Sequence, residues 1–183
     1  MKKSFLMLLC TAIALPSIGQ TVKGPRYRGF VDGTFLVGND GVYASEFNMK
    51  GGGFTTTHGY QINDHIFVGG GVGYYRMSYD MEGDYDYFGE TDYSYDIVPV
   101  YTNFRYQIAR RRVSPFIDVK LGSAISDDIG LYFSPSTGVR IGLAGKMGLN
   151  ITMGYTAMQG MVYDEDLGER VTHSLNLSVG IDF

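Results

Sequence analysis

The last thirteen residues, 171–183, alternate apolar and polar side chains with a period of two. Apart from His173, one alternate set is apolar and consists of Val171, Leu175, Leu177, Val179, Ile181 and Phe183. The positions between them hold only polar residues or glycine. Because successive side chains of a strand point to opposite faces, the pattern predicts a strand with one apolar and one polar face.

The same alternation recurs along the chain and predicts eight strands. We place them at residues 26–38, 50–62, 65–79, 95–109, 114–126, 131–145, 147–160 and 171–183. In the fourth strand, the apolar face holds Val98, Val100, Thr102, Phe104, Tyr106 and Ile108. A composition of 26 glycines and 15 tyrosines, without tryptophan, also favours an all-β fold.

The connections between these strands alternate in length. Short ones fall at 62–65, 110–114 and 145–147, and long ones at 39–49, 80–94 and 161–170, with a shorter one at 126–130. Up-and-down barrels have tight periplasmic turns at one end and longer loops at the other, and bacterial ones have an even number of strands. The sequence therefore predicts an eight-stranded antiparallel up-and-down transmembrane β-barrel.

The composition of the polar face decides which face points outward. A soluble, lipocalin-like barrel would carry many lysines and glutamates there, but this face is mostly Gly, Ser, Thr and Asn. Small residues suit the crowded interior of a narrow barrel, so we interpret the apolar face as lipid-facing. The charged residues on the inward face are Arg28, Asp32, Arg105, Asp118, Lys120, Arg140 and Asp182.

Buried charges persist only when they are paired, and the near balance of these seven allows pairing. We predict a structural interior charge cluster of Asp32, Arg105, Asp118, Lys120 and Arg140, with the three cations grouped around Asp118. On the apolar face, aromatic residues gather near the strand ends and predict two girdles. One holds Tyr27, Tyr60, Tyr106 and Phe183, and the other Phe35, Phe54, Tyr74 and Tyr155.

Residues 1–19 predict a cleavable signal peptide. Lys2 and Lys3 precede an apolar core at 5–15, which is too short to span a bilayer, and cleavage is expected before Gln20. An alternative is a lipoprotein acylated on Cys10. The remaining chain, 20–183, is one domain with no cysteine. Removing Lys2 and Lys3 leaves 13 basic against 19 acidic residues, a net charge of −6 that argues against a nucleic-acid partner.

The eight strands, the interior charges and the aromatic last residue resemble the small outer-membrane barrels of the OmpA-type transmembrane class. The runs 99–106 (PVYTNFRY) and 115–122 (PFIDVKLG) resemble the "outer membrane protein beta-barrel domain" family of Gram-negative bacteria. This resemblance implies a monomer integral to the bacterial outer membrane, exported through the periplasm, in contact with its lipid and lipopolysaccharide. It also implies that Ile181 and Phe183 belong to the signal read by the barrel-assembly machinery.

No catalytic group is recognisable in the sequence. The glycine runs 51–53 and 69–73 lie within predicted strands, so we interpret them as giving barrel curvature and interior space, not as phosphate loops. The pair His173–Ser174 is similar to the base and nucleophile of barrel-shaped lipid A deacylases. Adjacent strand residues face opposite ways, however, so we expect no enzyme activity and no cofactor.

The segment 80–96 contains seven acids and no base. Asp84, Asp86 and Asp92 are candidates for a divalent-cation site, because hard cations take clustered carboxylate oxygens. The alternative interpretation is a hydrated extracellular loop. Taken together, the sequence favours a non-enzymatic outer-membrane barrel with an envelope role or a surface-interaction role through acidic, tyrosine-rich loops. The alternatives are a narrow small-solute channel, a lipid-modifying barrel enzyme, or a soluble lipocalin-like ligand binder.

Overall fold

The computed structural model describes residues 25–39, 49–79, 93–109, 111–126, 129–143, 147–164 and 168–183. Within these ranges the chain forms eight strands: β1 (Arg26–Asn39), β2 (Met49–Gln61), β3 (Ile66–Tyr79), β4 (Tyr93–Gln107), β5 (Val113–Ile125), β6 (Ile129–Gly142), β7 (Gly148–Asp164) and β8 (Gly168–Asp182). The predicted signal peptide, 1–19, and the candidate metal ligands Asp84, Asp86 and Asp92 lie outside the described residues. No described helix is long and apolar enough to cross a membrane.

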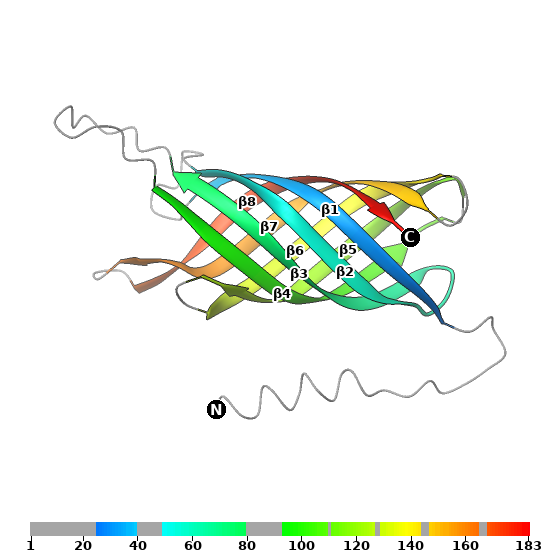
Figure 1. Cartoon of the computed structure of the whole chain (residues 1–183), viewed down its shortest axis with the longest axis horizontal. Coiled ribbons are helices and arrows are strands. Elements are labelled where there is room, and N and C mark those ends of the chain that lie inside the picture. The colour runs from blue at the N-terminus through cyan, green and yellow to red at the C-terminus, as the bar shows by residue number, and fades with distance from the viewer. Residues whose placement is uncertain are drawn as a thin grey trace, which may run out of the picture.

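The strands close into one antiparallel barrel in chain order. Each strand pairs with the next, and β1 closes the ring by pairing with β8 from Phe30↔Asp182 to Asn39↔His173. The strands are steeply tilted to the barrel axis, and the last strand ends beside the turns between β2 and β3, β4 and β5, and β6 and β7 (Figure 1). We call this the turn end of the barrel and the opposite end the loop end. The predicted fold class is thereby confirmed.

The predicted strand positions agree with the structure except near one hairpin. The expected long connection 161–170 is largely strand, because Tyr163 pairs with Glu169 and Asp164 with Gly168. A register shift between Gln159 and Tyr163 precedes these pairs. The β-bulge inserts extra residues that break the alternation on which the prediction relied, so the pattern hid the continuing strand pair.

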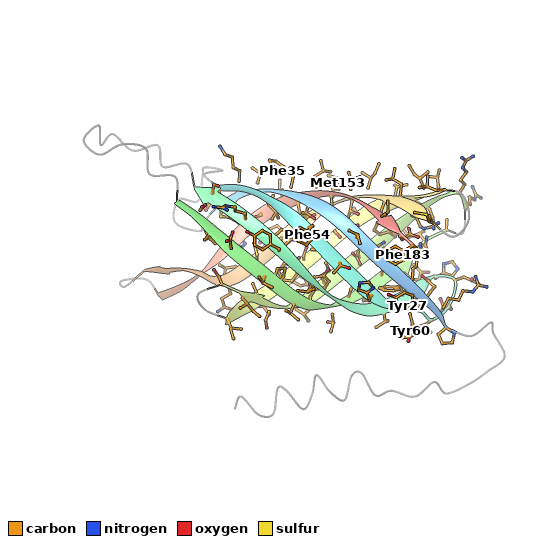
Figure 2. The ribbon with its side chains drawn as sticks, viewed as in Figure 1. Tyr27, Phe35, Phe54, Tyr60, Met153 and Phe183 are labelled. Atoms are coloured by element: carbon orange, nitrogen blue, oxygen red, sulfur yellow. The ribbon has the colours of Figure 1, made fainter. Side chains whose placement is uncertain are left out.

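The barrel is apolar on the outside of its described strands. Every one of the eight strands carries large, exposed apolar side chains on its outward face: they include Phe35 (55%), Phe54 (57%), Phe104 (47%), Met153 (65%) and Leu177 (55%). Their sticks stand off the ribbon all around the barrel (Figure 2). The inward positions between them are buried, and many are polar. The polarity of the two faces is therefore the reverse of that in a water-soluble domain, which buries apolar side chains and exposes polar ones.

The interior has two parts along the axis. Toward the loop end lies a buried apolar cluster of Leu36, Met49, Tyr75, Met77, Ile97, Tyr101, Ala124, Tyr132 and Met158. Toward the turn end lie the charged residues described below. We call these parts the apolar layer and the ionic layer. The predicted interior of small and charged residues thus describes the ionic layer.

Candidate functional site

The ionic layer is built from inward residues of six strands. β1 supplies Arg28 and Asp32, β4 supplies Arg105, β5 supplies Asp118 and Lys120, and the remaining members are Arg140 on β6, Asn150 on β7 and Asp182 on β8. All seven charged residues predicted to face inward do so. Five of them form two groups, and the other two, Asp32 and Lys120, face a small cavity, so there is no single cluster around Asp118 as the sequence suggested.

The first group is centred on Asp182, which is fully buried. Its carboxylate accepts hydrogen bonds from Arg28 Nη2 at 2.9 Å and from Arg140 Nε at 2.8 Å. Asn150 Nδ2 donates a further hydrogen bond at 3.0 Å. Two guanidinium groups therefore share one carboxylate, so removing this acid would take an ion-pair contact from both arginines at once.

The position of Arg140 corrects the predicted cluster. Asp118 lies opposite Ser136 on β6, four residues from Arg140, so the two charges occupy different levels of the barrel. Gly148 on β7 lies between Arg140 and Asp182. A Cβ atom at Gly148 would come within 2.6 Å of both side chains, so the glycine leaves the space through which Arg140 reaches Asp182. Alternation fixes the face of a residue, whereas its level depends on strand register.

The second group is centred on Arg105 and Asp118, which lie directly opposite each other on β4 and β5. Arg105 Nη2 lies 3.3 Å from Asp118 Oδ2, and both side chains are almost fully buried. The guanidinium is held between two rings, with its Cζ atom 4.1 Å from the centroid of Phe30 and 4.2 Å from that of Phe116. Cation–π contacts of this kind are strongest where water is excluded.

Asn150 joins the two groups and was not predicted. Its Oδ1 accepts a hydrogen bond from Arg105 Nη1 at 3.3 Å, and its Nδ2 donates to Asp182 Oδ1. Asn103 similarly donates to Asp118. The available signal was their place on the inward face of a predicted strand, because a buried amide needs hydrogen-bond partners. The network thus runs continuously from Arg28 to Asp118.

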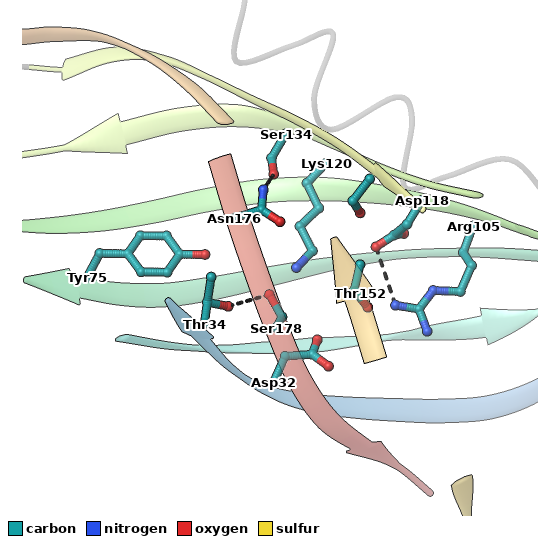
Figure 3. Close-up of a pocket in the computed structure, with 11 residues that line it drawn as sticks. Asp32, Thr34, Tyr75, Arg105, Asp118, Lys120, Ser134, Thr152, Asn176 and Ser178 are labelled. Atoms are coloured by element: carbon teal, nitrogen blue, oxygen red, sulfur yellow. Dashed lines mark hydrogen bonds and ion pairs between the residues drawn. The ribbon is translucent and has the colours of Figure 1, made fainter. Parts of the chain in front are cut away.

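A small cavity lies between Asp32 and Lys120, further along the axis. Both residues reach toward the same space, with Thr152 and Ser178 beside them (Figure 3). The cavity has a volume of about 10 Å³, which is room for about one water molecule. Asp32 Oδ1 is buried without a hydrogen-bond partner among the described residues. Lys120 Nζ lies 3.5 Å from Thr55 Oγ1 and 5.3 Å from the centroid of the Tyr101 ring.

The predicted girdle at the turn end lies near the strand ends, where Tyr27, Tyr60 and Phe183 point outward (Figure 2). Phe35 and Phe54 of the other predicted girdle also point outward, but they lie nearer the middle of β1 and β2 than expected. Phe183 packs its ring over Gly29, where a Cβ atom would come within 2.7 Å of it. Ile181 is outward and 40% exposed. The last residue is therefore part of the seam that closes the barrel.

The structure also places the residues weighed for catalysis and metal binding. His173 is exposed and contacts Tyr155, whereas Ser174 is buried inside the barrel, so the two residues face opposite ways. Within the described ranges, no group of three or more His, Cys, Asp or Glu side chains is placed to hold a metal ion. Glycines 71 and 53 give room to Tyr101 and Tyr75, which agrees with their interpretation as spacers.

Comparison with known proteins supports the fold. No protein-family model matches the sequence, and no curated protein is significantly similar to it. The crystal structure of Neisserial surface protein A (NspA) matches with a TM-score of 0.58 at 17% identity, over 87% of this chain and 98% of that chain. The solid-state NMR structure of outer membrane protein AlkL in DMPC lipid bilayers matches with a TM-score of 0.54 at 15% identity, over 92% and 94%. The chain therefore has the fold of the small eight-stranded outer-membrane barrels, which confirms the resemblance at the level of fold.

Proposed function

We propose that this protein is an integral outer-membrane β-barrel without enzymatic activity, which serves the envelope or presents its loops to a partner. The observation that carries the proposal is the inverted barrel: the outer wall is a continuous belt of exposed Val, Leu, Ile, Phe and Met, while charged residues are buried inside. A closed barrel satisfies every backbone hydrogen bond within its own wall, as a bilayer requires.

The orientation follows from the connections. In single-chain bacterial barrels the short turns face the periplasm and the longer loops face outward. The turn end, with Phe183, then lies at the periplasmic surface and the loop end at the cell surface. Ile181 and Phe183 would be the part of the chain that the assembly machinery reads. We expect a monomer, because the closed wall offers no free strand edge through which two barrels could share a sheet.

The alternatives fit the geometry less well. A lipocalin-like binder would carry water-facing charges outside, where these strands carry large apolar side chains. A deacylase-like enzyme would need His173 and Ser174 on one face. A narrow channel is favoured by the cavity beside Lys120, but side chains of both layers fill the lumen around it.

Cell fractionation combined with gel electrophoresis tests the proposal. The protein should be recovered in the outer-membrane fraction, and unboiled samples should migrate differently from boiled ones. The shift is expected because a closed ladder of strand hydrogen bonds has no edge from which to open in detergent. Recovery in the soluble periplasm without a heat-dependent shift would contradict membrane insertion and favour the lipocalin-like alternative.

A further inference from the structure

The cavity between Asp32 and Lys120 lies between opposite walls of the barrel. The strands close in chain order, so β2 to β4 separate β1 from β5 on one side of the ring and β6 to β8 on the other. Asp32 extends inward from β1 and Lys120 from β5, and both line the cavity (Figure 3). The ion pairs of the two groups described above join strands that are adjacent or two apart. The cavity is therefore where charges from two opposite walls meet.

The Asp32 carboxylate needs a hydrogen-bond donor that the described residues do not supply. Its side chain belongs to a residue that is only 3% exposed, and Oδ1 has no hydrogen-bond partner among the described residues. A carboxylate that loses its hydration without gaining a donor destabilises the folded state. The acid therefore points to a ligand in the cavity that donates a hydrogen bond.

The Lys120 ammonium group has the opposite need. It carries three N–H donors and no acceptor. Its hydrogen bond to Thr55 Oγ1 is long, at 3.5 Å, and such bonds are weak. Within the described ranges, Lys120 forms no direct ion pair with Asp32. A ligand that accepts a hydrogen bond from Nζ would therefore satisfy the ammonium group.

The charges around the cavity select a neutral ligand. The charged lining residues are two acids, Asp32 and Asp118, and two bases, Arg105 and Lys120, so their formal charges cancel. An added ion would leave an unbalanced charge in the lumen, whereas a neutral molecule would not. The volume of about 10 Å³ admits about one water molecule. Water fits both needs, because it donates and accepts hydrogen bonds at the same time.

Thr152 offers this water a third partner. It lines the cavity from β7, and its hydroxyl makes no hydrogen bond with another lining residue (Figure 3). The hydroxyls of Thr34 and Ser178, in contrast, lie 2.9 Å apart and bond each other. Buried waters typically make about three hydrogen bonds to groups that are otherwise unsatisfied. Asp32, Lys120 and Thr152 supply that number from three strands.

From these observations we infer that the cavity binds one structural water molecule, which completes a water-mediated ion pair between Lys120 and Asp32. The water accepts a hydrogen bond from Lys120 Nζ and donates one to the Asp32 carboxylate. A bridging water can be nearly as favourable as a direct hydrogen bond. Because Asp32 lies opposite Gly180 of β8, the bridge holds the closing seam between β1 and β8 to the opposite wall. The site lies in the lumen and is independent of the envelope role proposed above.

A high-resolution crystal structure of the intact wild-type barrel tests the site directly. Electron density should show one water within hydrogen-bond distance of both Lys120 Nζ and the Asp32 carboxylate. Crystals soaked in rubidium chloride should give no anomalous peak in the cavity, because the Lys120 ammonium repels a second cation. A direct Lys120–Asp32 ion pair without an intervening water would overturn the inference. So would a cavity without density, or a rubidium peak within it.

Unfolding rates in urea test whether the bridge couples the two walls. Asp32→Asn and Lys120→Met each remove one charge at similar side-chain size, and each should raise the unfolding rate about tenfold. The double variant should unfold about as fast as either single variant, because each single change leaves one charge without its partner. Thr55→Val with Lys120→Met is the control pair, whose effects should multiply because their contact is long.

Each variant is first checked for the heat-dependent gel shift, and the wild-type crystal structure decides the site if one fails to fold. Multiplying effects of Asp32→Asn and Lys120→Met would contradict the coupling between the two walls. Wild-type unfolding rates in both single variants would contradict it as well. A stronger coupling of Lys120 with Thr55 than with Asp32 would assign Lys120 to the wrong partner and overturn the bridge.

Discussion

The buried acids of the lumen differ in how many partners each one holds. Asp182 serves two arginines and Asn150, whereas Asp118 serves Arg105 and Asn103. Asp32 faces the cavity with one oxygen unpaired by any described residue. Removing a carboxylate therefore leaves a different number of cations uncompensated at each site.

Asp118→Ala should destabilise the barrel strongly. Removing one partner of a buried ion pair commonly costs about 3–5 kcal/mol, because the remaining charge stays buried. Here the stranded cation is Arg105, which is held between Phe30 and Phe116 and cannot turn toward water. Urea unfolding in detergent, followed by the heat-dependent gel shift, measures the effect. Asp96→Ala is the control, because Asp96 is exposed on the outer wall.

Arg105→Ala combined with Asp118→Ala should restore part of that loss. The two residues are in direct contact, so their effects on the free energy of unfolding should not add. The restoration should be incomplete, because the double variant still lacks the contacts of Arg105 with both rings. Strictly additive losses would show that the pair is not coupled, and would contradict the ion pair at 3.3 Å.

At the scale of strands, two of the three interior acids described above face a glycine on a neighbouring strand. Asp32 lies opposite Gly180, and Asp182 lies opposite Gly148. A Cβ atom at Gly180 would come within 2.0 Å of Asp32 Oδ1 and 2.4 Å of the Val31 carbonyl oxygen. These glycines give the carboxylates room inside a wall whose strands are less than 5 Å apart.

Gly180→Ala should therefore weaken the seam between β1 and β8. The added methyl group meets backbone as well as the Asp32 carboxylate, so the strands must separate locally to admit it. Gly33→Ala is a matched control on the next pair of the same seam, where a Cβ atom would meet only the Val179 carbonyl oxygen, at 3.7 Å. The folded fraction on unboiled gels should fall for Gly180→Ala alone. If the folded fraction fell equally in both variants, the cause would be the lost backbone freedom of glycine and not the contact with Asp32.

Strand positions and faces were predictable because alternation with a period of two reports them directly. It placed Phe104 outside and Arg105 inside on β4, and the same rule separated His173 from Ser174. The register between neighbouring strands was not predictable, because the alternation along one strand does not say which residue of the next strand lies opposite. Arg140 was therefore assigned to Asp118 when it contacts Asp182, and the bulge after Gln159 concealed the extension of β7.

Over the whole molecule, the lumen is filled in two different ways. The ionic layer closes it with paired charges, and the apolar layer closes it with bulky side chains. Three tyrosines from different strands meet across the apolar layer: the hydroxyls of Tyr75 and Tyr132 lie 3.5 Å apart, and the rings of Tyr101 and Tyr132 lie 5.7 Å apart. The methionines of the apolar layer occupy positions that the sequence marks only as inward.

This filling predicts that the reconstituted barrel passes ions poorly. An eight-stranded barrel is just wide enough for its own side chains, and all three tyrosines are almost fully buried in it. Planar bilayer recordings should show no stable conductance for the wild-type protein.

Two variants separate the contributions of the two layers. Asp32→Ala with Lys120→Ala should remain closed, because it enlarges the cavity but leaves the apolar layer intact. The triple variant Tyr75→Ala, Tyr101→Ala, Tyr132→Ala should be the first to admit ions, provided that it still shows the gel shift. Large, uniform conductance steps from the wild-type barrel would contradict this account of the lumen and favour the channel alternative.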